Sequence, residues 1–339
     1  MITRMKRRTR KSAWARSLER SLVAFTRGAV KSGARALGQA MKPALARRTP
    51  PAGEGAWILG IASGMAGARR FRLYRPPGVA AGERLPLMVM LHGCGQDANT
   101  FARTTRMNRV ALRERFLVLY PEQDRLANAQ GCWNWFDSTA GRAGGEAALI
   151  MKMIDQVCLL HSADPTRVAI AGLSAGASMA ALLVTRHPAR FRAVVMHSGV
   201  PPGTAHSTLS ALGAMHGRRA TKPLEATPLA VESGWPPLLV IHGDADKVVA
   251  LQNAHAAAQQ WAEGLGARAR PPRSVQRGQR HAMTVTDFRR AGRLVSRLAL
   301  VRGLAHAWSG GAAQLPYSDP LGPDASRMAW AFAAAQFRG

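Results

Sequence analysis

Short apolar segments alternate with amphipathic segments along most of the chain after residue 70. Apolar or alternating runs of four or five residues predict strands, and apolar residues three or four positions apart predict helices. The expected strands are residues 70–74, 87–91, 117–120, 168–171, 193–196, 238–241 and 298–301, and the expected helices are residues 100–116, 146–160, 175–186, 253–261 and 325–337. Short buried strands separated by helices predict an α/β fold, with a mostly parallel central sheet flanked by helices on both faces.

The same pattern divides the chain into three parts. Residues 1–50 are a basic tail, residues 51–69 are a linker and lead-in, and residues 70–339 form one domain. Within this domain, residues 201–236 show no clear period, and such a long excursion between core strands predicts a cap or substrate loop. Residues 264–281, rich in Arg, Pro and Gln, predict a surface loop.

The tail carries a large share of the charge. The whole chain has a formal net charge of +28, and residues 1–50 contribute +13 of it. In the tail the apolar residues Trp14, Leu18, Leu22 and Phe25 share one face at helical spacing. This pattern is typical of an amphipathic helix that binds an anionic surface or a polymer granule. A helix packed on the domain, or a solvated tail, explains the pattern equally well.

Several classes of protein are disfavoured by what the sequence lacks. No apolar stretch reaches the roughly 18 residues that a transmembrane helix needs, and arginines interrupt the apolar run that a signal peptide requires. The three cysteines, Cys94, Cys132 and Cys158, match no zinc-ligand spacing. No known nucleic-acid motif is present, so we expect no specific nucleic-acid partner.

A candidate nucleophile lies in Gly172-Leu-Ser-Ala-Gly176. The motif follows an expected strand and opens an expected helix, which is the context of the nucleophile elbow in α/β hydrolases. The two glycines allow a sharp turn that exposes the Ser174 hydroxyl, and the helix dipole favours negative charge there. The alternative is an ordinary Gly-Ser helix cap.

A serine hydroxyl needs a base to remove its proton, and the base needs an acid to orient it. In this fold the acid follows the nucleophile in the chain and the base comes last. Asp244 and Asp246 follow the expected strand 238–241. Asp246, at the far side of the turn, is the preferred acid; for either residue the alternative is a turn-capping carboxylate.

Three histidines follow the acid. His255 lies on an alanine-rich helix and His281 lies among arginines, whereas His306 follows an expected strand and is flanked by small residues in a loop. His306 is therefore the preferred base. His92 and His242 precede glycines at strand ends, and we expect them to brace loops.

Ester cleavage also needs backbone donors for the oxyanion of the tetrahedral intermediate. The N–H of Ala175, next to the nucleophile, is one candidate. The second is expected from the loop after the early strand 87–91, and the N–H of Cys94 is the most plausible donor there.

Longer segments carry a resemblance to a known family. The chain resembles the polyhydroxybutyrate (PHB) depolymerase esterases, a branch that also contains feruloyl and acetyl xylan esterases. The segments that carry the resemblance are His-Gly-Cys-Gly-Gln at 92–96, Cys-Trp-Asn-Trp-Phe at 132–136, Asp-Pro-Thr-Arg-Val at 164–168, Gly-Leu-Ser-Ala-Gly at 172–176, His-Gly-Asp-Ala-Asp at 242–246, His-Ala-Trp-Ser-Gly-Gly at 306–311 and Asp-Pro-Leu-Gly-Pro-Asp-Ala-Ser at 319–326. They occur in the family's order and span residues 70–338.

The resemblance implies Ser174, Asp246 and His306 as the catalytic triad and Cys94 and Ala175 as the oxyanion donors. It also implies an α/β-hydrolase fold and no metal or organic cofactor. Members of this family are commonly secreted, so the implied location is extracellular or periplasmic. Because no clear signal peptide is present, a cytoplasmic, granule-associated protein is the alternative.

The resemblance implies further roles for the cysteines and two tryptophans. A disulfide would join Cys94 to Cys132, and Cys158 would remain a buried thiol. Trp133 and Trp135 would line the acyl pocket, with simple packing as an equally good explanation.

The expected activity is hydrolysis of carboxylic esters, with 3-hydroxybutyrate oligomers or polyester as substrate. A feruloyl or acetyl xylan esterase is the alternative within the same class. No polymer-binding domain follows the last expected helix, which favours oligomers over crystalline polymer. A non-catalytic protein that binds granules or polyanions is the alternative from another class.

Overall fold

One large sheet forms the centre of the molecule. The computed structural model describes residues 50–138, 140–224 and 234–338. Eleven strands within these residues form a sheet in the order β1-β2-β4-β3-β5-β6-β7-β11-β10-β8, with β9 also paired to β10. The strands are β1 (Ala56–Gly64), β2 (Gly67–Arg75), β3 (Leu85–Leu91), β4 (Leu117–Pro121), β5 (Ala163–Leu173), β6 (Ala193–His197), β7 (Leu238–Gly243), β8 (Arg268–Ala269), β9 (Arg273–Val275), β10 (Met283–Arg290) and β11 (Arg293–Val301).

The central strands run parallel and the outer strands run antiparallel. Parallel pairing joins β4 to β3, and continues through β5, β6 and β7 to β11. The β1–β2 hairpin and β10 extend the two sides of the sheet in antiparallel fashion. A short separate pair, β12 (Trp308–Ser309) with β13 (Ser318–Asp319), lies in the C-terminal loops. The mostly parallel sheet predicted from the sequence is therefore confirmed.

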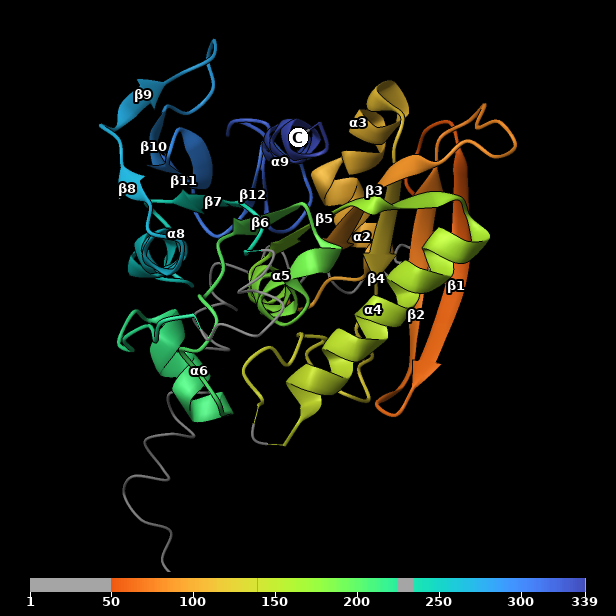
Figure 1. The fold of residues 1–339 in the computed structure, drawn as a ribbon, viewed down its shortest axis with the longest axis horizontal. Helices are drawn as coiled ribbons and strands as arrows, with labels where there is room; N and C mark the ends of the chain where they lie inside the picture. The colour runs from red at the N-terminus through yellow and green to blue at the C-terminus, as the bar shows by residue number, and fades with distance from the viewer. Residues whose placement is uncertain (1–49, 139, 225–233, 339) are drawn as a thin grey trace, which may run out of the picture. The chain divides into compact units, whose positions relative to one another are not determined.

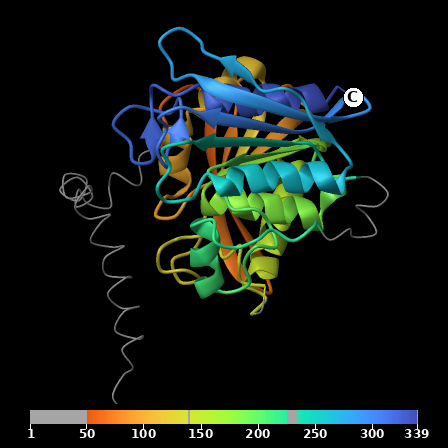
Figure 2. The same ribbon diagram turned by 90° about the vertical axis from the view of Figure 1, so that its left-hand side faces the viewer.

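Helices cover both faces of the sheet (Figures 1 and 2). One face packs against α4 (Arg142–Leu160), α5 (Ala175–Arg186) and α8 (Gln252–Gly264), and the other packs against α2 (Ala98–Thr105), α3 (Met107–Glu114) and α9 (Ala325–Gln336). Side chains of β3 show why two layers are needed. Leu87 and Val89 point into the first core, and Met88 and Met90 point into the second. Every residue of β3 is buried, as expected for a strand covered on both sides.

The structure departs from the expected pattern at a few places. The expected helix 100–116 is two helices, because Arg106 adopts a left-handed conformation (φ 55°) between α2 and α3. Residues 51–69, expected as linker and lead-in, include β1, whose alternation is obscured by glycines. The expected surface loop 264–281 contains the short strands β8 and β9.

The expected cap region contains a short helix, α6 (Thr208–Met215). Its N-terminus has a capping box, in which the side chains of Ser207 and Ser210 bond to each other's backbone N–H groups. Residues 225–233 of this region, and the basic tail of residues 1–49, lie outside the described residues. Within the residues described, no helix is long and apolar enough to cross a membrane.

Candidate active site

Ser174 lies at the junction of β5 and α5, as the motif predicts. Its backbone has φ 56° and ψ −121°, a conformation that non-glycine residues adopt rarely and mostly at functional positions. The Ser174 N–H donates to the carbonyl of His197 at 2.9 Å, which holds the turn against β6. The side chain is thereby presented at the N-terminus of α5, where the helix dipole favours negative charge.

The two glycines of the motif are required by close packing of the backbone. A Cβ on Gly172 would lie 2.3 Å from the backbone of Gly176. A Cβ on Gly176 would lie 2.2 Å from the carbonyl oxygen of Leu91, at the end of β3. The first turn of α5 can therefore approach the oxyanion loop after β3 because both positions lack side chains.

His306 and Asp246 contact each other directly. The Nδ1 atom of His306 lies 2.8 Å from Oδ2 of Asp246. The second carboxylate oxygen, Oδ1, accepts hydrogen bonds from the N–H groups of Val248 and Val249, each at 2.9 Å. The Asp246 side chain is fully buried, and that of His306 is 9% exposed.

These contacts favour the ionised form of Asp246. Burial raises the pKa of Asp246, but the hydrogen bond from His306 and the bond from the Val249 N–H outweigh it, so the pKa lies below its usual value. An ionised carboxylate only accepts, so Nδ1 of a neutral His306 carries the proton and donates it. The Nε2 atom of His306 is then free to accept a proton.

The three loops that carry these residues leave the same edge of the sheet. β5, β7 and β11 belong to one parallel set, and Ser174, Asp246 and His306 follow their carboxyl ends. This edge is where active sites of open α/β sheets occur. Among the hydrogen bonds of the described residues, none joins the Ser174 hydroxyl to His306.

The alternative candidates for the acid and the base have other contacts. Asp244 is exposed and accepts a hydrogen bond from the N–H of Gly303 at 2.6 Å, so it braces the start of the His306 loop. His255 is exposed on α8. His281 lies 3.3 Å from Asp319. The structure therefore pairs Asp246, and not Asp244, with a histidine that follows it in the chain.

The proposed oxyanion donors lie on the two segments that approach each other at Gly176, the start of α5 and the loop after β3. Ala175 is the first residue of α5, and Cys94 follows β3 by three residues. None of the hydrogen bonds formed within the described residues uses the backbone N–H of Ala175 or of Cys94. Both N–H groups are thus available to an external acceptor, as their assigned role requires.

The predicted disulfide between Cys94 and Cys132 is confirmed. It ties the oxyanion loop to the loop that carries Trp133 and Trp135. These tryptophans are 1% and 9% exposed and pack in the core that α4 and α5 cover. Their packing role is evident, and a contact with substrate remains a prediction. Cys158 is a half-buried free thiol.

A buried carboxylate, Glu146, organises this tryptophan loop, and sequence reasoning missed it. Its oxygens accept hydrogen bonds from the backbone N–H of Asn134 at 2.8 Å and from the side-chain amides of Asn134 and Gln123 at 2.6 Å each. The backbone N–H of Gln123 in turn donates to His92 Nε2 at 3.1 Å. The signal available was an acidic residue inside an otherwise apolar helix pattern.

Buried histidines and an arginine hold the loops around the site. His92 and His242 brace loops as predicted, through hydrogen bonds to the carbonyls of Gly93 and Val249. His197, which was missed, accepts a hydrogen bond from the N–H of Ser309 at 3.1 Å and stacks on Trp308. Burial lowers the pKa of His197 to about 3, so the ring is neutral.

Arg106 is a second brace that the sequence did not indicate. Its guanidinium donates to the carbonyl oxygens of Gly310 and Gly311, the latter at 2.9 Å. The segment 303–311, which includes His306 and β12, is therefore held at its start by Asp244, in its middle by Asp246, and at its end by His197 and Arg106.

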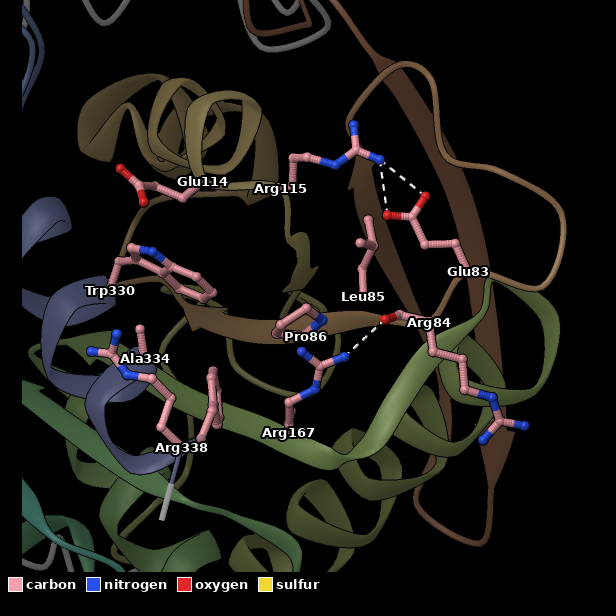
Figure 3. A pocket seen from close by; sticks show the side chains of 11 residues that line it. Glu83, Arg84, Leu85, Pro86, Glu114, Arg115, Arg167, Trp330, Ala334 and Arg338 are labelled. Carbon is pink, nitrogen blue, oxygen red and sulfur yellow. Dashed lines mark hydrogen bonds and ion pairs between the residues drawn. The ribbon is translucent and has the colours of Figure 1, made fainter.

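A pocket of about 360 Å³, called the larger pocket below, lies at the ends of the strands opposite to those that carry the candidate catalytic residues (Figure 3). It is lined by Leu85, the first residue of β3, and by Trp330 of α9. Arg115 there pairs with Glu83 at 2.9 Å. None of the candidate catalytic residues lines this pocket. Within the described residues, no cluster of three or more His, Cys, Asp or Glu side chains could hold a metal ion.

Comparison with known proteins shows which family the chain belongs to. The model of the family described as esterase PHB depolymerase matches residues 69–267, which include Ser174 and Asp246 but not His306. Poly(3-hydroxyalkanoate) depolymerase C of Paucimonas lemoignei is 32% identical over 198 residues, covering 55% of this chain and 46% of that protein. Acetylxylan esterase A of Emericella nidulans is 27% identical over 219 residues, covering 61% of this chain and 70% of that protein.

Solved structures support the same fold. An acetyl xylan esterase from Aspergillus awamori matches with a TM-score of 0.56 at 19% identity, covering 74% of this chain and 94% of that structure. An α/β hydrolase from the metagenome of Lake Arreo matches with a TM-score of 0.54 at 17% identity, covering 96% and 98%. The predicted α/β-hydrolase fold is confirmed. The match spans less than half the length of the Paucimonas lemoignei depolymerase.

Proposed function

Because the chain belongs to the esterase PHB depolymerase family, we propose that it is a serine esterase that hydrolyses carboxylic esters. One observation carries this proposal. His306 Nδ1 is hydrogen-bonded to the buried carboxylate of Asp246. This pair lies at the same edge of the sheet as the turn that carries Ser174. These residue types in this chain order suit nucleophilic acyl transfer.

The proposed reaction has two steps. His306 Nε2 takes the proton of Ser174 Oγ as the oxygen attacks the ester carbonyl, and Asp246 stabilises the resulting imidazolium. The N–H groups of Cys94 and Ala175 donate to the oxyanion, and His306 then protonates the leaving alcohol. In the second step His306 deprotonates a water molecule, which attacks the carbonyl of the acyl-enzyme. His306 then returns the proton to Ser174 Oγ as the acid is released.

The proposed substrates are 3-hydroxybutyrate oligomers or the corresponding polyester. The support is the 32% identity with the poly(3-hydroxyalkanoate) depolymerase. A second candidate, an acetyl xylan or feruloyl ester, is favoured by the acetylxylan esterase and feruloyl esterase relatives and by the fold match to an acetyl xylan esterase.

Steady-state hydrolysis of soluble 3-hydroxybutyrate oligomers, acetylated xylan and a feruloyl ester tests both proposals. The Ser174→Ala protein serves as the blank, and we expect its turnover to be lower by up to about 10⁶-fold. Turnover of Ser174→Ala near that of the wild type would rule out this nucleophile. Faster cleavage of the xylan or feruloyl ester than of the oligomers would replace the polyester assignment.

We also propose that the protein works in an oxidising compartment, outside the cell or in the periplasm, because disulfides persist there. The basic tail is proposed to attach the protein to an anionic surface or a polymer granule. Deleting residues 1–50 should then abolish binding to anionic vesicles or polyhydroxybutyrate granules and leave the hydrolysis of small esters unchanged. Unchanged binding after the deletion would refute the role of the tail.

A further inference from the structure

A small pocket lined mainly by arginines lies apart from the candidate active site. It has a volume of about 210 Å³ and lies between the start of α3, the loop before β10 and the start of α9. None of the proposed catalytic residues lines it. Its lining residues are Thr105, Arg106, Arg109, Val110, Arg113, Arg280, Asp324 and Arg327.

Two of these arginines are oriented by backbone carbonyls, which accept hydrogen bonds without neutralising the charge. Arg106 donates to the carbonyls of Gly310 and Gly311. Arg280 donates to the carbonyl of Gly322 at 2.6 Å. Their positions are therefore fixed by the fold before any ligand arrives, which reduces the entropy that binding must overcome.

Two more arginines are exposed, and the described part of the chain gives their guanidinium groups no partner. Among the hydrogen bonds and ion pairs of the described residues, none involves the guanidinium of Arg109 or of Arg327. Arg113 pairs with the neighbouring Glu114, and both side chains are about half exposed. Arg115 and Arg167 of the larger pocket likewise have carboxylate partners, so Arg109 and Arg327 differ from all three of these arginines.

The one carboxylate in the lining, Asp324, offsets only part of this charge. Asp324 caps α9, because its side chain accepts a hydrogen bond from the backbone N–H of Arg327 at 3.0 Å. The start of α9 also adds the positive end of a helix dipole to the pocket. Five guanidinium groups around so small a volume repel one another, and a bound anion would relieve that repulsion.

The charge and size indicate the kind of anion. A volume of 210 Å³ is below the roughly 300–1,000 Å³ of pockets for drug-sized ligands, so the ligand is small. Guanidinium groups bind phosphate oxygens in a bidentate manner, and a phosphate offers more charge and more oxygens than a carboxylate. We propose that this pocket binds a phosphate group, either as inorganic phosphate or as the end of a phosphate monoester.

Titration calorimetry of the full chain at constant ionic strength tests this proposal. The ligands are inorganic phosphate and glycerol 3-phosphate, with acetate as the monoanionic control. We expect saturable binding of at least one phosphate, and the Arg109→Ala/Arg327→Ala protein should bind it at least tenfold more weakly. A matched pair of exposed arginines outside the pocket, Arg268→Ala/Arg270→Ala, should change the dissociation constant less than twofold.

The outcomes separate the two sources of phosphate. Binding of both ligands indicates a pocket open enough for a monoester, and binding of inorganic phosphate alone indicates a closed one. Equal weakening by the two arginine pairs, or acetate binding as tightly as phosphate, would show diffuse charge attraction and overturn the proposal. Ester hydrolysis by each variant shows that the protein is folded.

Discussion

Because His306 Nδ1 is bonded to Asp246, the tautomer of His306 depends on residue 246 presenting a hydrogen-bond acceptor to it. Oδ2 accepts from His306, while Oδ1 is occupied by the N–H groups of Val248 and Val249. An amide at this position would be held with its oxygen toward those N–H groups. Its NH₂ group would then face His306 and favour the tautomer that protonates Nε2.

We therefore expect Asp246→Asn to lower kcat by about 10⁴-fold, by analogy with the effect of that change in a catalytic triad. The fold should be retained, because asparagine can accept from the same backbone N–H groups. Pre-steady-state kinetics with a chromogenic ester measure the loss, and Asp244→Asn is the matched control. A loss as large in the Asp244 variant would contradict the assignment of the acid.

At the residue scale, the sequence-based expectations agree with the observed geometry where a motif or a chain order constrains the residue. Ser174 is fixed by its two glycines, and the choice of Asp246 over Asp244 agrees with the observed contact to His306. Glu146 and Arg106 could not be found in this way. An acidic residue in an apolar helix pattern marks Glu146 as unusual, but the partners of both residues, Asn134 and Gly310, are defined by tertiary packing.

At the scale of elements, prediction succeeded for buried strands and failed where tertiary contacts override local pattern. The helix α5 matches the expected 175–186 because an apolar face and a glycine turn specify it. The break at Arg106 has no local signal, since the arginine adopts its left-handed conformation while its side chain holds the distant Gly310 loop. The strand β10 was not expected from the sequence, although it pairs with β11 across the tight turn at Ala291 and Gly292.

The disulfide joins two loops that both contribute to the candidate site, so its loss should affect stability and turnover together. It spans 38 residues, and a loop of that size corresponds to about 4 kcal/mol in the chain-entropy account. We expect Cys132→Ser to lower the free energy of unfolding by up to that amount and to lower kcat, because the Cys94 N–H loses its anchor. Urea unfolding and ester hydrolysis measure the two effects.

The other cysteine provides the control for this experiment. Cys158→Ser should leave both quantities nearly unchanged, because that thiol is free and lies outside the candidate site. If Cys132→Ser retained full turnover, the disulfide would contribute to stability alone and not to positioning of the oxyanion loop.

At the scale of the whole molecule, buried neutral histidines make one contribution to how stability varies with pH. Burial lowers the pKa of His92, His197 and His242 below the ordinary value of 6.5, for His197 to about 3. Below pH 6.5 the unfolded chain binds protons at these positions and the folded chain does not. The contribution of these histidines to stability is therefore full above about pH 6.5 and is lost as the pH falls toward the folded pKa values.

For His197 the loss should be about 1.4 kcal/mol per pH unit between pH 6 and pH 4. His197→Gln removes this titration, so its free energy of unfolding should fall less steeply over that range than that of the wild type. Chemical denaturation at several pH values measures the slope, with the exposed His255→Gln as control. Identical slopes in the His197 variant and the wild type would show that this ring titrates normally.

The half-buried Cys158 has a consequence for how the protein matures. Three thiols allow three different single disulfides in an unfolded chain, and only one of them is native. The fold itself selects the right pair, because it brings the Cα atoms of Cys94 and Cys132 to 4.2 Å and raises the pKa of the Cys158 thiol by burial. Correct biogenesis therefore requires the central sheet to assemble before oxidation, or an isomerase to undo the wrong pairs.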